Sequence, residues 1–426
     1  MASGTASPEL EVIGREGELS RLRDFVLGEP NERVVVLSGG PGVGKTTLWE
    51  AAVAASTEQG AHVLSARAAE AEKTLPFATL SDLFQWIPIE AGPDLPEPQR
   101  RALDVALLRA EPAGAPAKTR AIALGVLSVL RSLAVERPVL VAIDDVQWTD
   151  AASMEALAFA ARRLDGESVR IMLARRPGRP TPLEQATASR ATGLILEGLS
   201  LGAVRRLLAT RLELVLSRRV VRQVFEGTLG NPLFVLELGR TLTEVGPPAI
   251  GEELALPDSL DELLGARASA APKPRRALLA VALGGGLTVS ELVELVGDDA
   301  LEAAVERGLL LEEDGRLRPS HPLLAAALLK RVRARERREL HRALAEVVSE
   351  PARRARHLAL AATLPDTELA RIVAAGAAGA LARGATQQAV ELAEQALRLT
   401  PTGAAERHER VLELAEWLKR ANEVSR

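Results

Sequence analysis

Residues 34–47 pass from a short apolar run through a glycine-rich turn into a helix, which constrains the fold more than any other stretch. They read Val-Val-Val-Leu-Ser-Gly-Gly-Pro-Gly-Val-Gly-Lys-Thr-Thr. The β-branched run predicts a buried strand, and the pattern G-x-x-x-x-G-K-[ST] is met by Gly39, Gly44, Lys45 and Thr46. Strand, turn and helix in this order predict an α/β domain that binds a nucleoside triphosphate.

Each residue type in this turn has a physical task. Glycines let successive backbone N–H groups point into one concavity, and the new helix adds its own free N–H groups. Lys45 can reach the β- and γ-phosphates, and the Thr46 hydroxyl can join a Mg²⁺ shell. The expected ligands are therefore ATP or ADP with Mg²⁺. The expected phosphate-binding residues are Gly39, Gly40, Pro41, Gly42, Val43, Gly44, Lys45, Thr46 and Thr47.

Composition excludes several other classes of protein. Of 426 residues 47% are hydrophobic and none is cysteine, so the chain should fold without disulfides or a cysteine metal site. A net charge of −4 gives no global argument for binding nucleic acid or an anionic membrane. No apolar stretch approaches ~18 residues and the N-terminus lacks the regions of a secretion signal, so a cytoplasmic protein is expected.

Strand and helix patterns alternate between residues 33 and 174. The predicted strands are 34–38, 61–66, 138–143 and 169–174, with a further candidate at 193–197. The predicted helices between them are 45–59, 77–87, 97–110, 117–135 and 151–164. Continuous apolar strands between helices predict a mostly parallel sheet that is covered on both faces.

Strand patterns become rare after residue 198. Three short helices are predicted at 201–212, 218–228 and 232–245, before a Gly-Pro-Pro break at 246–248 that cannot continue a helix. A small hairpin at Leu309–Leu311 and Leu317, around Gly315, lies among predicted helices, which is the outline of a winged helix. Small residues recurring between 370 and 401 suit a 34-residue helix–turn–helix repeat of the tetratricopeptide kind.

These patterns predict five parts. They are a disordered N-terminus (1–9), a P-loop ATPase core (10–198), a helical lid (199–247), a winged-helix-like domain (248–350) and a tetratricopeptide-like helical segment (351–426). The chain stops partway into a possible further repeat, which suggests a truncated product or an array that caps itself early.

Two carboxylates follow the apolar run at 139–143. Active residues of open α/β sheets gather outside the carboxyl ends of the strands, so Asp144 and Asp145 should face the nucleotide. Asp144 would hold Mg²⁺, directly or through water, and Asp145 would polarise the attacking water. The alternative is a strand that simply runs into an acidic turn.

Three further residues have a functional and an ordinary structural interpretation. An arginine at the end of the strand 169–173, Arg175 or Arg176, could contact the γ-phosphate, or both could be solvated surface side chains. Pro232 could pack on an adenine face, or could simply start a helix. His321 could contact the β-phosphate from another domain, or could be a capping or core histidine.

Seven motifs together resemble those of the STAND class of signal-transduction ATPases. More specifically, they resemble the N-terminal part of the large ATP-binding LuxR-type transcription regulators of actinobacteria. It covers about residues 10–360. In chain order the motifs are Ile13–Leu19, the P-loop with Trp49, Asp144–Asp150, Ala174–Pro177, Gly230–Phe234, His321–Leu323 and Arg338–Ala345.

The resemblance implies roles for individual residues. Gly14 and Arg15 would line the adenine pocket, and Pro232 would touch the base. His321 resembles the histidine of the Met-His-Asp motif, which grips the ADP β-phosphate in resting relatives. Ser320 and Pro322 stand here in place of its neighbours. The resemblance also favours Arg176 over Arg175 as the residue that contacts the γ-phosphate.

The resemblance implies a slowly hydrolysing ATP switch whose Lys45, Asp145 and Arg176 take part in turnover. ADP would hold three domains together, a signal ligand or protein on the repeats would open them, and ATP would favour self-association. DNA binding is expected only through a C-terminal domain that is not visible in this sequence.

Other functions remain open at this stage. One is an AAA+-type remodelling motor with fast hydrolysis, and another is a scaffold that binds nucleotide for stability. A third is a transcription factor that acts through its winged helix. The last is an ATP-binding module associated with an adenylyl cyclase or kinase-type signalling protein.

Overall fold

The computed structural model describes residues 12–28, 32–87, 95–111, 119–246, 260–269, 271–313 and 316–424. The expected disordered N-terminus (1–9), the prolines at 247 and 248, and Gly315 of the expected hairpin turn lie outside the described residues.

A five-stranded parallel sheet forms the centre of the N-terminal part. Its strands are β1 (Val34–Gly39), β2 (His62–Arg67), β3 (Val139–Asp144), β4 (Val169–Arg175) and β5 (Ala191–Leu196). They are ordered β2-β3-β4-β1-β5, and every neighbouring pair is parallel. The carboxyl ends of β1, β3 and β4 therefore meet at one edge of the sheet.

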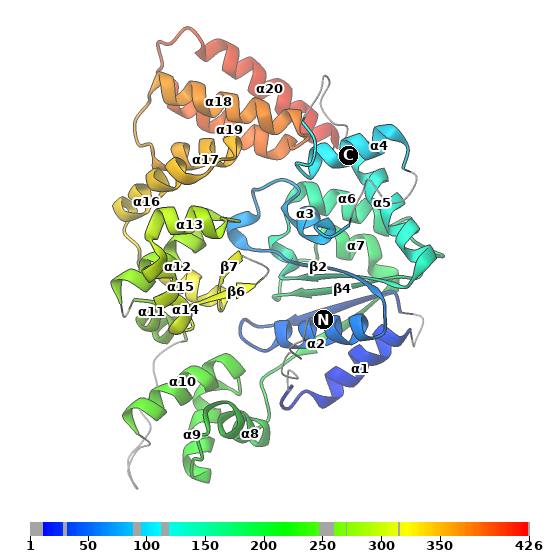
Figure 1. Ribbon diagram of the computed structural model, residues 1–426, viewed down its shortest axis with the longest axis vertical. Helices are drawn as coiled ribbons and strands as arrows, with labels where there is room; N and C mark the ends of the chain where they lie inside the picture. The colour runs from blue at the N-terminus through cyan, green and yellow to red at the C-terminus, as the bar shows by residue number, and fades with distance from the viewer. Residues whose placement is uncertain are drawn as a thin grey trace, which may run out of the picture.

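Alternate residues of each strand face two separate hydrophobic layers. On β1, Val34 and Val36 belong to one buried cluster, whereas Val35 and Leu37 belong to the other. Helices α1 (Glu16–Leu27) and α2 (Lys45–Glu58) cover the second layer (Figure 1). The first layer is covered by α3 (Ala78–Phe84), α4 (Glu97–Ala106), α5 (Thr119–Glu136), α6 (Ala151–Ala161) and α7 (Pro182–Thr187). The predicted parallel sheet with two covered faces is confirmed.

Three helices with their own small core follow β5. They are α8 (Leu201–Leu212), α9 (Arg218–Thr228) and α10 (Pro232–Val245), and their bounds are those predicted. Each begins at a residue whose side chain accepts a backbone N–H: Ser200, Ser217 and Asn231. We refer to α8–α10 as the lid helices.

The next part, which we call the central unit, packs helices around an antiparallel hairpin. It comprises α11 (Leu260–Ser269), α12 (Pro272–Gly284), α13 (Val289–Val296), α14 (Asp298–Glu306), β6 (Leu310–Glu313), β7 (Arg316–Pro319), α15 (Pro322–Arg331) and α16 (Ala334–Val347). Most of its buried hydrophobic residues form one cluster. Helices and a hairpin occur where predicted, and the winged-helix assignment remains an interpretation.

Four C-terminal helices end the described chain. They are α17 (Pro351–Ala361), α18 (Thr367–Ala382), α19 (Thr386–Leu399) and α20 (Arg407–Val424). Small residues let α17 and α18 approach closely, since a Cβ at Gly376 would lie 2.5 Å from the Ala355 Cβ. The predicted helical character is confirmed, and the tetratricopeptide assignment stays a prediction.

Some predicted elements were wrong in extent or were missed. Helix α3 ends at Phe84 and α4 at Ala106, short of the predicted ends at 87 and 110, and Leu108 adopts a left-handed φ of 58°. Helices α1 and α7 were not predicted. The six-residue α7 has a capping box between Thr181 and Glu184, a pattern that is readable in the sequence.

Among the described residues, no helix is both long enough and apolar enough to cross a membrane.

Candidate nucleotide-binding site

The loop between β1 and α2 adopts left-handed backbone conformations at two of its glycines, as its sequence led us to expect. Gly42 and Gly44 have φ values of 76° and 99°, which side chains other than glycine rarely adopt. Gly39 leaves no room for a Cβ, which would lie 2.9 Å from the Leu196 carbonyl. The loop therefore depends on glycine for its conformation and for its contact with β5.

Lys45 is buried at the start of α2, and its ammonium group is directed back onto this loop. Its Nζ donates to the carbonyls of Gly39 (3.0 Å) and Gly40 (2.9 Å). Burial lowers the pKa of Lys45, while the carboxylates of Asp145 and Asp144 oppose that shift. A buried ammonium held by neutral carbonyls can exchange them for phosphate oxygens, which are stronger partners.

Asp144 and Thr46 meet at the carboxyl end of β3. The Thr46 hydroxyl donates to Asp144 Oδ2 at 2.7 Å, although the two residues are 98 positions apart. Burial raises the pKa of the Asp144 carboxyl to about 6, and the neighbouring Asp145 carboxylate adds to that shift. The described residues contain no group of three His, Cys, Asp or Glu that could hold a metal on their own. A hydroxyl beside a buried carboxylate suits Mg²⁺, which takes few protein ligands and completes its shell with phosphate and water.

Asp145 lies beside this pair in a left-handed conformation, with φ 48°. Its backbone N–H donates to Asp144 Oδ1 at 2.9 Å. Its carboxylate accepts a 2.6 Å hydrogen bond from Gln147 Nε2 and lies 3.9 Å from Arg176 Nε. The carboxylate is thus positioned by two side chains and has oxygen lone pairs left for a water molecule.

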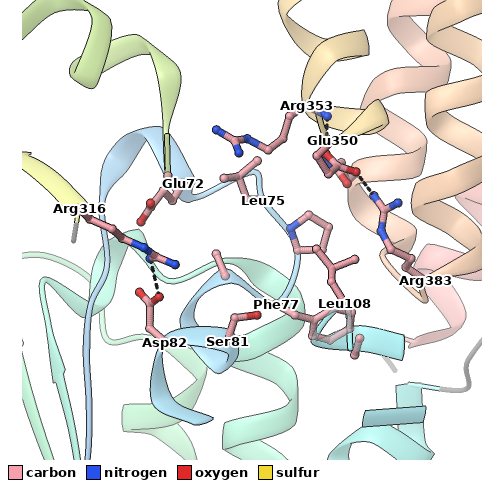
Figure 2. Close-up of a pocket in the computed structure, with 15 residues that line it drawn as sticks. Glu72, Leu75, Phe77, Ser81, Asp82, Leu108, Arg316, Glu350, Arg353 and Arg383 are labelled. Atoms are coloured by element: carbon pink, nitrogen blue, oxygen red, sulfur yellow. Dashed lines mark hydrogen bonds and ion pairs between the residues drawn. The ribbon is translucent and has the colours of Figure 1, made fainter. Parts of the chain in front are cut away.

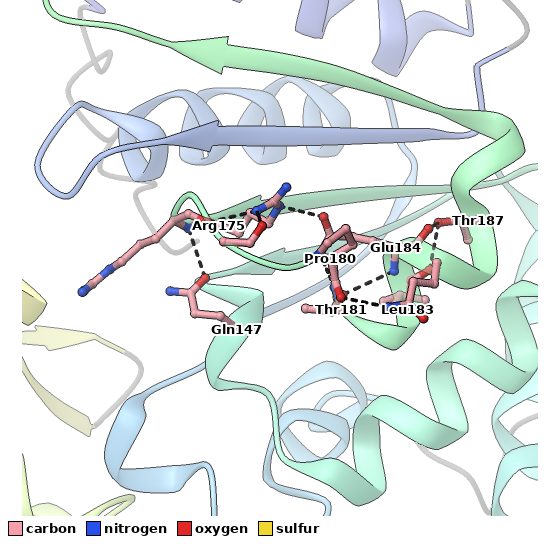
Figure 3. A network of polar contacts seen from close by, with 10 residues as sticks. Gln147, Arg175, Pro180, Thr181, Leu183, Glu184 and Thr187 are labelled. Carbon is pink, nitrogen blue, oxygen red and sulfur yellow. Dashed lines mark hydrogen bonds and ion pairs between the residues drawn. The ribbon is translucent and has the colours of Figure 1, made fainter. Parts of the chain in front are cut away.

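The two arginines after β4 have different surroundings. Arg175 forms an ion pair with Glu184 of α7 at 2.7 Å and donates to the carbonyls of Arg176 and Gly178. Figure 3 shows this network, together with the 3.3 Å hydrogen bond from the Arg176 backbone N–H to Gln147 Oε1. The side chain of Arg175 therefore binds Glu184 of α7, whereas the side chain of Arg176 lies near Asp145.

Gly14 and Arg15 hold other parts of the domain against the loop. The Arg15 guanidinium donates to the Val43 carbonyl at 3.1 Å and also to the Glu197 carbonyl after β5. A Cβ on Gly14 would lie 2.4 Å from the Ala203 Cβ in α8. These contacts tie the loop, β5 and the lid helices together, and a role for Gly14 and Arg15 in binding adenine remains a prediction.

The lid helices contact the phosphate-binding loop directly. Asn231 Nδ2 donates to the Pro41 carbonyl at 2.9 Å, and the Leu233 backbone N–H donates to the Gly42 carbonyl at 3.2 Å. Pro232 lies between these two contacts, at the first position of α10. Leu233 also packs on the hydrophobic cluster of the central unit.

His321 of the central unit caps α15, its Nδ1 accepting from the Leu323 N–H at 3.1 Å. Burial lowers the pKa of His321 to about 4, and the positive charges of Arg176 and Lys45 add to the shift. The imidazole is therefore neutral at pH 7, and with Nδ1 as acceptor the hydrogen is on Nε2. The ring thus carries one N–H donor, and the charges of Arg176 and Lys45 act on it.

The roles of Asn231 and Gln147 were not predicted, although both residues lie in motifs of the sequence. An asparagine directly before a helix-starting proline signals an N-cap. The contact between Asn231 and Pro41 spans 190 residues, and no local pattern announces such a contact.

A comparison with protein-family models gives one match for this region. Residues 11–173 match the family described as the AAA ATPase domain, and they include the loop, Asp144 and Asp145. Over these residues the chain is similar to an AAA ATPase domain, and we refer to this part as the ATPase domain. Arg176, the lid helices and the central unit lie beyond the matched residues.

Several solved structures are similar to this chain at low sequence identity. A Walker-type ATPase of Pyrococcus abyssi is 17% identical, with a TM-score of 0.39, and the match covers 75% of this chain and 97% of that one. The Orc1 protein of Aeropyrum pernix, solved in complex with DNA, is 16% identical, with a TM-score of 0.36 and coverages of 75% and 93%. A RuvB mutant of Thermotoga maritima is 16% identical, with a TM-score of 0.32 and coverages of 74% and 96%. A search of curated proteins gave no match.

Proposed function

We propose that this chain is a signal-transduction switch that binds Mg-ATP, hydrolyses it slowly, and changes the packing of its domains with the state of the nucleotide. The observation that carries the proposal is the convergence of three parts on one loop. Leu233 donates to the Gly42 carbonyl and packs on the central unit, and His321 of that unit is near Lys45. A nucleotide in this place would contact groups from the ATPase domain, the lid helices and the central unit.

The chemistry follows from the positions of the side chains. Lys45 and the loop N–H groups bind the β- and γ-phosphates, and the neutral His321 adds a donor from another domain. Thr46 and Asp144 would hold Mg²⁺, which would neutralise charge on the phosphates. Asp145 orients and polarises the attacking water, while Arg176 contacts the γ-phosphate.

Slow turnover agrees with the surroundings of Asp145. Its carboxylate already accepts a 2.6 Å bond from Gln147 and faces the Arg176 guanidinium. These partners occupy part of the hydrogen-bonding capacity of the carboxylate and fix its orientation. Together with the resemblance to STAND ATPases and LuxR-type regulators, this favours a switch over a motor.

Steady-state hydrolysis of Mg-ATP tests the proposed function. We expect turnover well below about 1 s⁻¹, and ADP binding that raises the melting temperature. Faster turnover without a stimulus would favour the AAA+-type remodelling ATPase. Stabilisation by ADP with no hydrolysis under any condition would favour a nucleotide-binding scaffold.

Arg176→Ala should selectively weaken the binding of ATP, because its guanidinium is expected to contact the γ-phosphate, which ADP lacks. We expect about tenfold weaker binding of a non-hydrolysable ATP analogue and unchanged binding of ADP. Isothermal titration with each nucleotide measures this. Arg179→Ala, which changes an exposed arginine three residues away, is the matched control. An equal loss for ATP and ADP would remove the γ-phosphate role from Arg176.

A further inference from the structure

A cavity of about 200 Å³ lies away from the nucleotide site, where three parts of the molecule meet. Its lining includes Glu72 and Phe77 from the ATPase domain, Arg316 from the central unit, and Arg353 and Arg383 from the C-terminal helices (Figure 2). A ligand bound there would touch all three parts at once.

One side of this cavity is apolar. Leu75 and Phe77 precede α3, and Leu108 follows α4. Leu108 is 62% exposed and has a left-handed φ of 58°. An exposed leucine at the rim of a partly enclosed space is an apolar surface that a ligand can cover.

The other side carries charges, and its arginines already have partners. Arg316 donates to Asp82 at 2.9 Å, and Arg383 forms an ion pair with Glu350 at 2.9 Å. A terminal nitrogen of Arg353 donates to the carbonyls of Gly284 and Gly285, whereas its buried Nε has no hydrogen-bond partner among the described residues. An anionic ligand would therefore compete with existing partners for Arg316, Arg383 and the terminal nitrogen of Arg353.

Two hydrogen-bond acceptors in the lining, Glu72 and Gln388, lack partners within the described part of the chain. No hydrogen bond or ion pair joins the Glu72 carboxyl to any residue that the structure describes, whereas Asp82 and Glu350 are both paired. The side chain of Gln388 is 5% exposed, and its Oε1 accepts no hydrogen bond from the described residues. A buried acceptor without a partner is unfavourable, so the part of the wall formed by Glu72 and Gln388 favours a guest that donates hydrogen bonds.

We propose that this cavity is an effector site for a small amine with an apolar body, with Glu72 as its counter-ion. The ammonium group donates to Glu72, and the apolar body covers Leu75, Phe77 and Leu108. A cavity of ~150 Å³ in another protein holds benzene, so this one suits a phenyl ring with a short aminoalkyl chain.

Binding there would stabilise the contact between the ATPase domain and the central unit. The two approach closely on this side, because a Cβ on Gly285 would lie 2.7 Å from the Ala71 carbonyl. The Glu72 carboxyl lies 3.0 Å from the Cβ position of Gly286. An amine held by Glu72 therefore acts on this junction whether or not the proposed nucleotide chemistry is correct.

Isothermal titration of the full chain with 2-phenylethylamine tests the site. We expect saturable binding with a Kd on the order of 1 mM or tighter, and at least about tenfold weaker binding in Glu72→Gln, since a charge-assisted bond is lost. Glu70→Gln removes the same charge from an exposed position two residues away and should bind as the wild type. Leu108→Ala should weaken binding by about threefold to tenfold, because apolar contact is lost.

Two further ligands with the same phenyl ring test which head group the site prefers. We expect 2-phenylethanol to bind more weakly than the amine and 3-phenylpropanoate to bind weakest. The carboxylate binding as tightly as the amine would overturn the proposal, as would an amine affinity unchanged by Glu72→Gln. Absence of saturable amine binding to the wild type, with nucleotide binding intact, would reject the effector site and leave the proposed function standing.

The amine affinity should also rise with pH. Burial raises the pKa of Glu72 to about 7, and Asp82 of α3 adds to the shift, whereas Arg316 and Arg318 of β7 and Arg353 of α17 oppose it. Ionised Glu72 binds the ammonium group, so affinity should increase from pH 6 to pH 8 while the amine stays protonated. Glu72→Gln should lose this pH dependence, and a wild-type affinity that is flat across this range would contradict the role of Glu72.

Discussion

Lys45→Ala is expected to lower the affinity for Mg-ATP by on the order of 100-fold or more. The ammonium group is buried against the carbonyls of Gly39 and Gly40, next to the position where phosphates would lie. The substitution removes a positive charge that is already buried and positioned to bind the phosphates. Titration of the wild type and the variant with ATP and ADP measures the loss, which should affect both nucleotides because both carry a β-phosphate.

Two controls separate this loss from damage to the fold. Lys45→Met keeps much of the aliphatic chain and should lose nucleotide binding as fully as the alanine variant. Lys273→Ala removes a lysine whose side chain is 71% exposed, and it should bind nucleotide normally. Unchanged ATP affinity in a folded Lys45→Ala protein would mean that the site has been assigned to the wrong residues.

Asp145→Asn is expected to abolish turnover while leaving nucleotide binding intact. Asparagine tolerates the left-handed backbone that Asp145 adopts, so the loop should keep its shape. The amide cannot take a proton from water as a carboxylate does, and general-base catalysis of this kind contributes about 100-fold or more to rate. Single-turnover hydrolysis of radiolabelled ATP measures the effect, and Asp145→Ala should show the same loss.

The matched control is Asp165→Asn, at an aspartate whose side chain is 78% exposed and lies away from the loop. It should hydrolyse ATP at the wild-type rate. If Asp145→Asn also retained that rate, the catalytic role would belong to another residue, and Asp144 would be the first to examine.

The phosphate-binding loop and the end of β3 could be predicted from sequence because their signals are local. The sequence of Gly39–Thr46 itself indicates the conformation of the loop, because the glycines at 42 and 44 permit a left-handed backbone. The alternating burial of Val34 to Leu37 follows from their position in a strand that is covered on both faces. The sheet and its helical layers follow from such patterns.

The remaining parts of the site depend on contacts between distant residues. Nothing near Asn231 in the sequence indicates that its amide reaches Pro41. Nothing near His321 indicates that burial, together with the charges of Arg176 and Lys45, lowers its pKa. The ends of α3 and α4 were misplaced because tertiary packing, rather than helix propensity, ends them. The cavity beside Glu72 is likewise formed by segments that meet only in the folded chain.

Distance measurements between the ATPase domain and the C-terminal helices test the central claim directly. The chain contains no cysteine, so Val135→Cys and Leu364→Cys would supply the two sites for fluorescent labels. Both positions are exposed, at 87% in α5 and 75% between α17 and α18. The proposed switch predicts high energy transfer with saturating ADP and clearly lower transfer with a non-hydrolysable ATP analogue. Equal transfer with the two nucleotides, both shown to be bound, would contradict the claim that nucleotide state controls the packing of the domains.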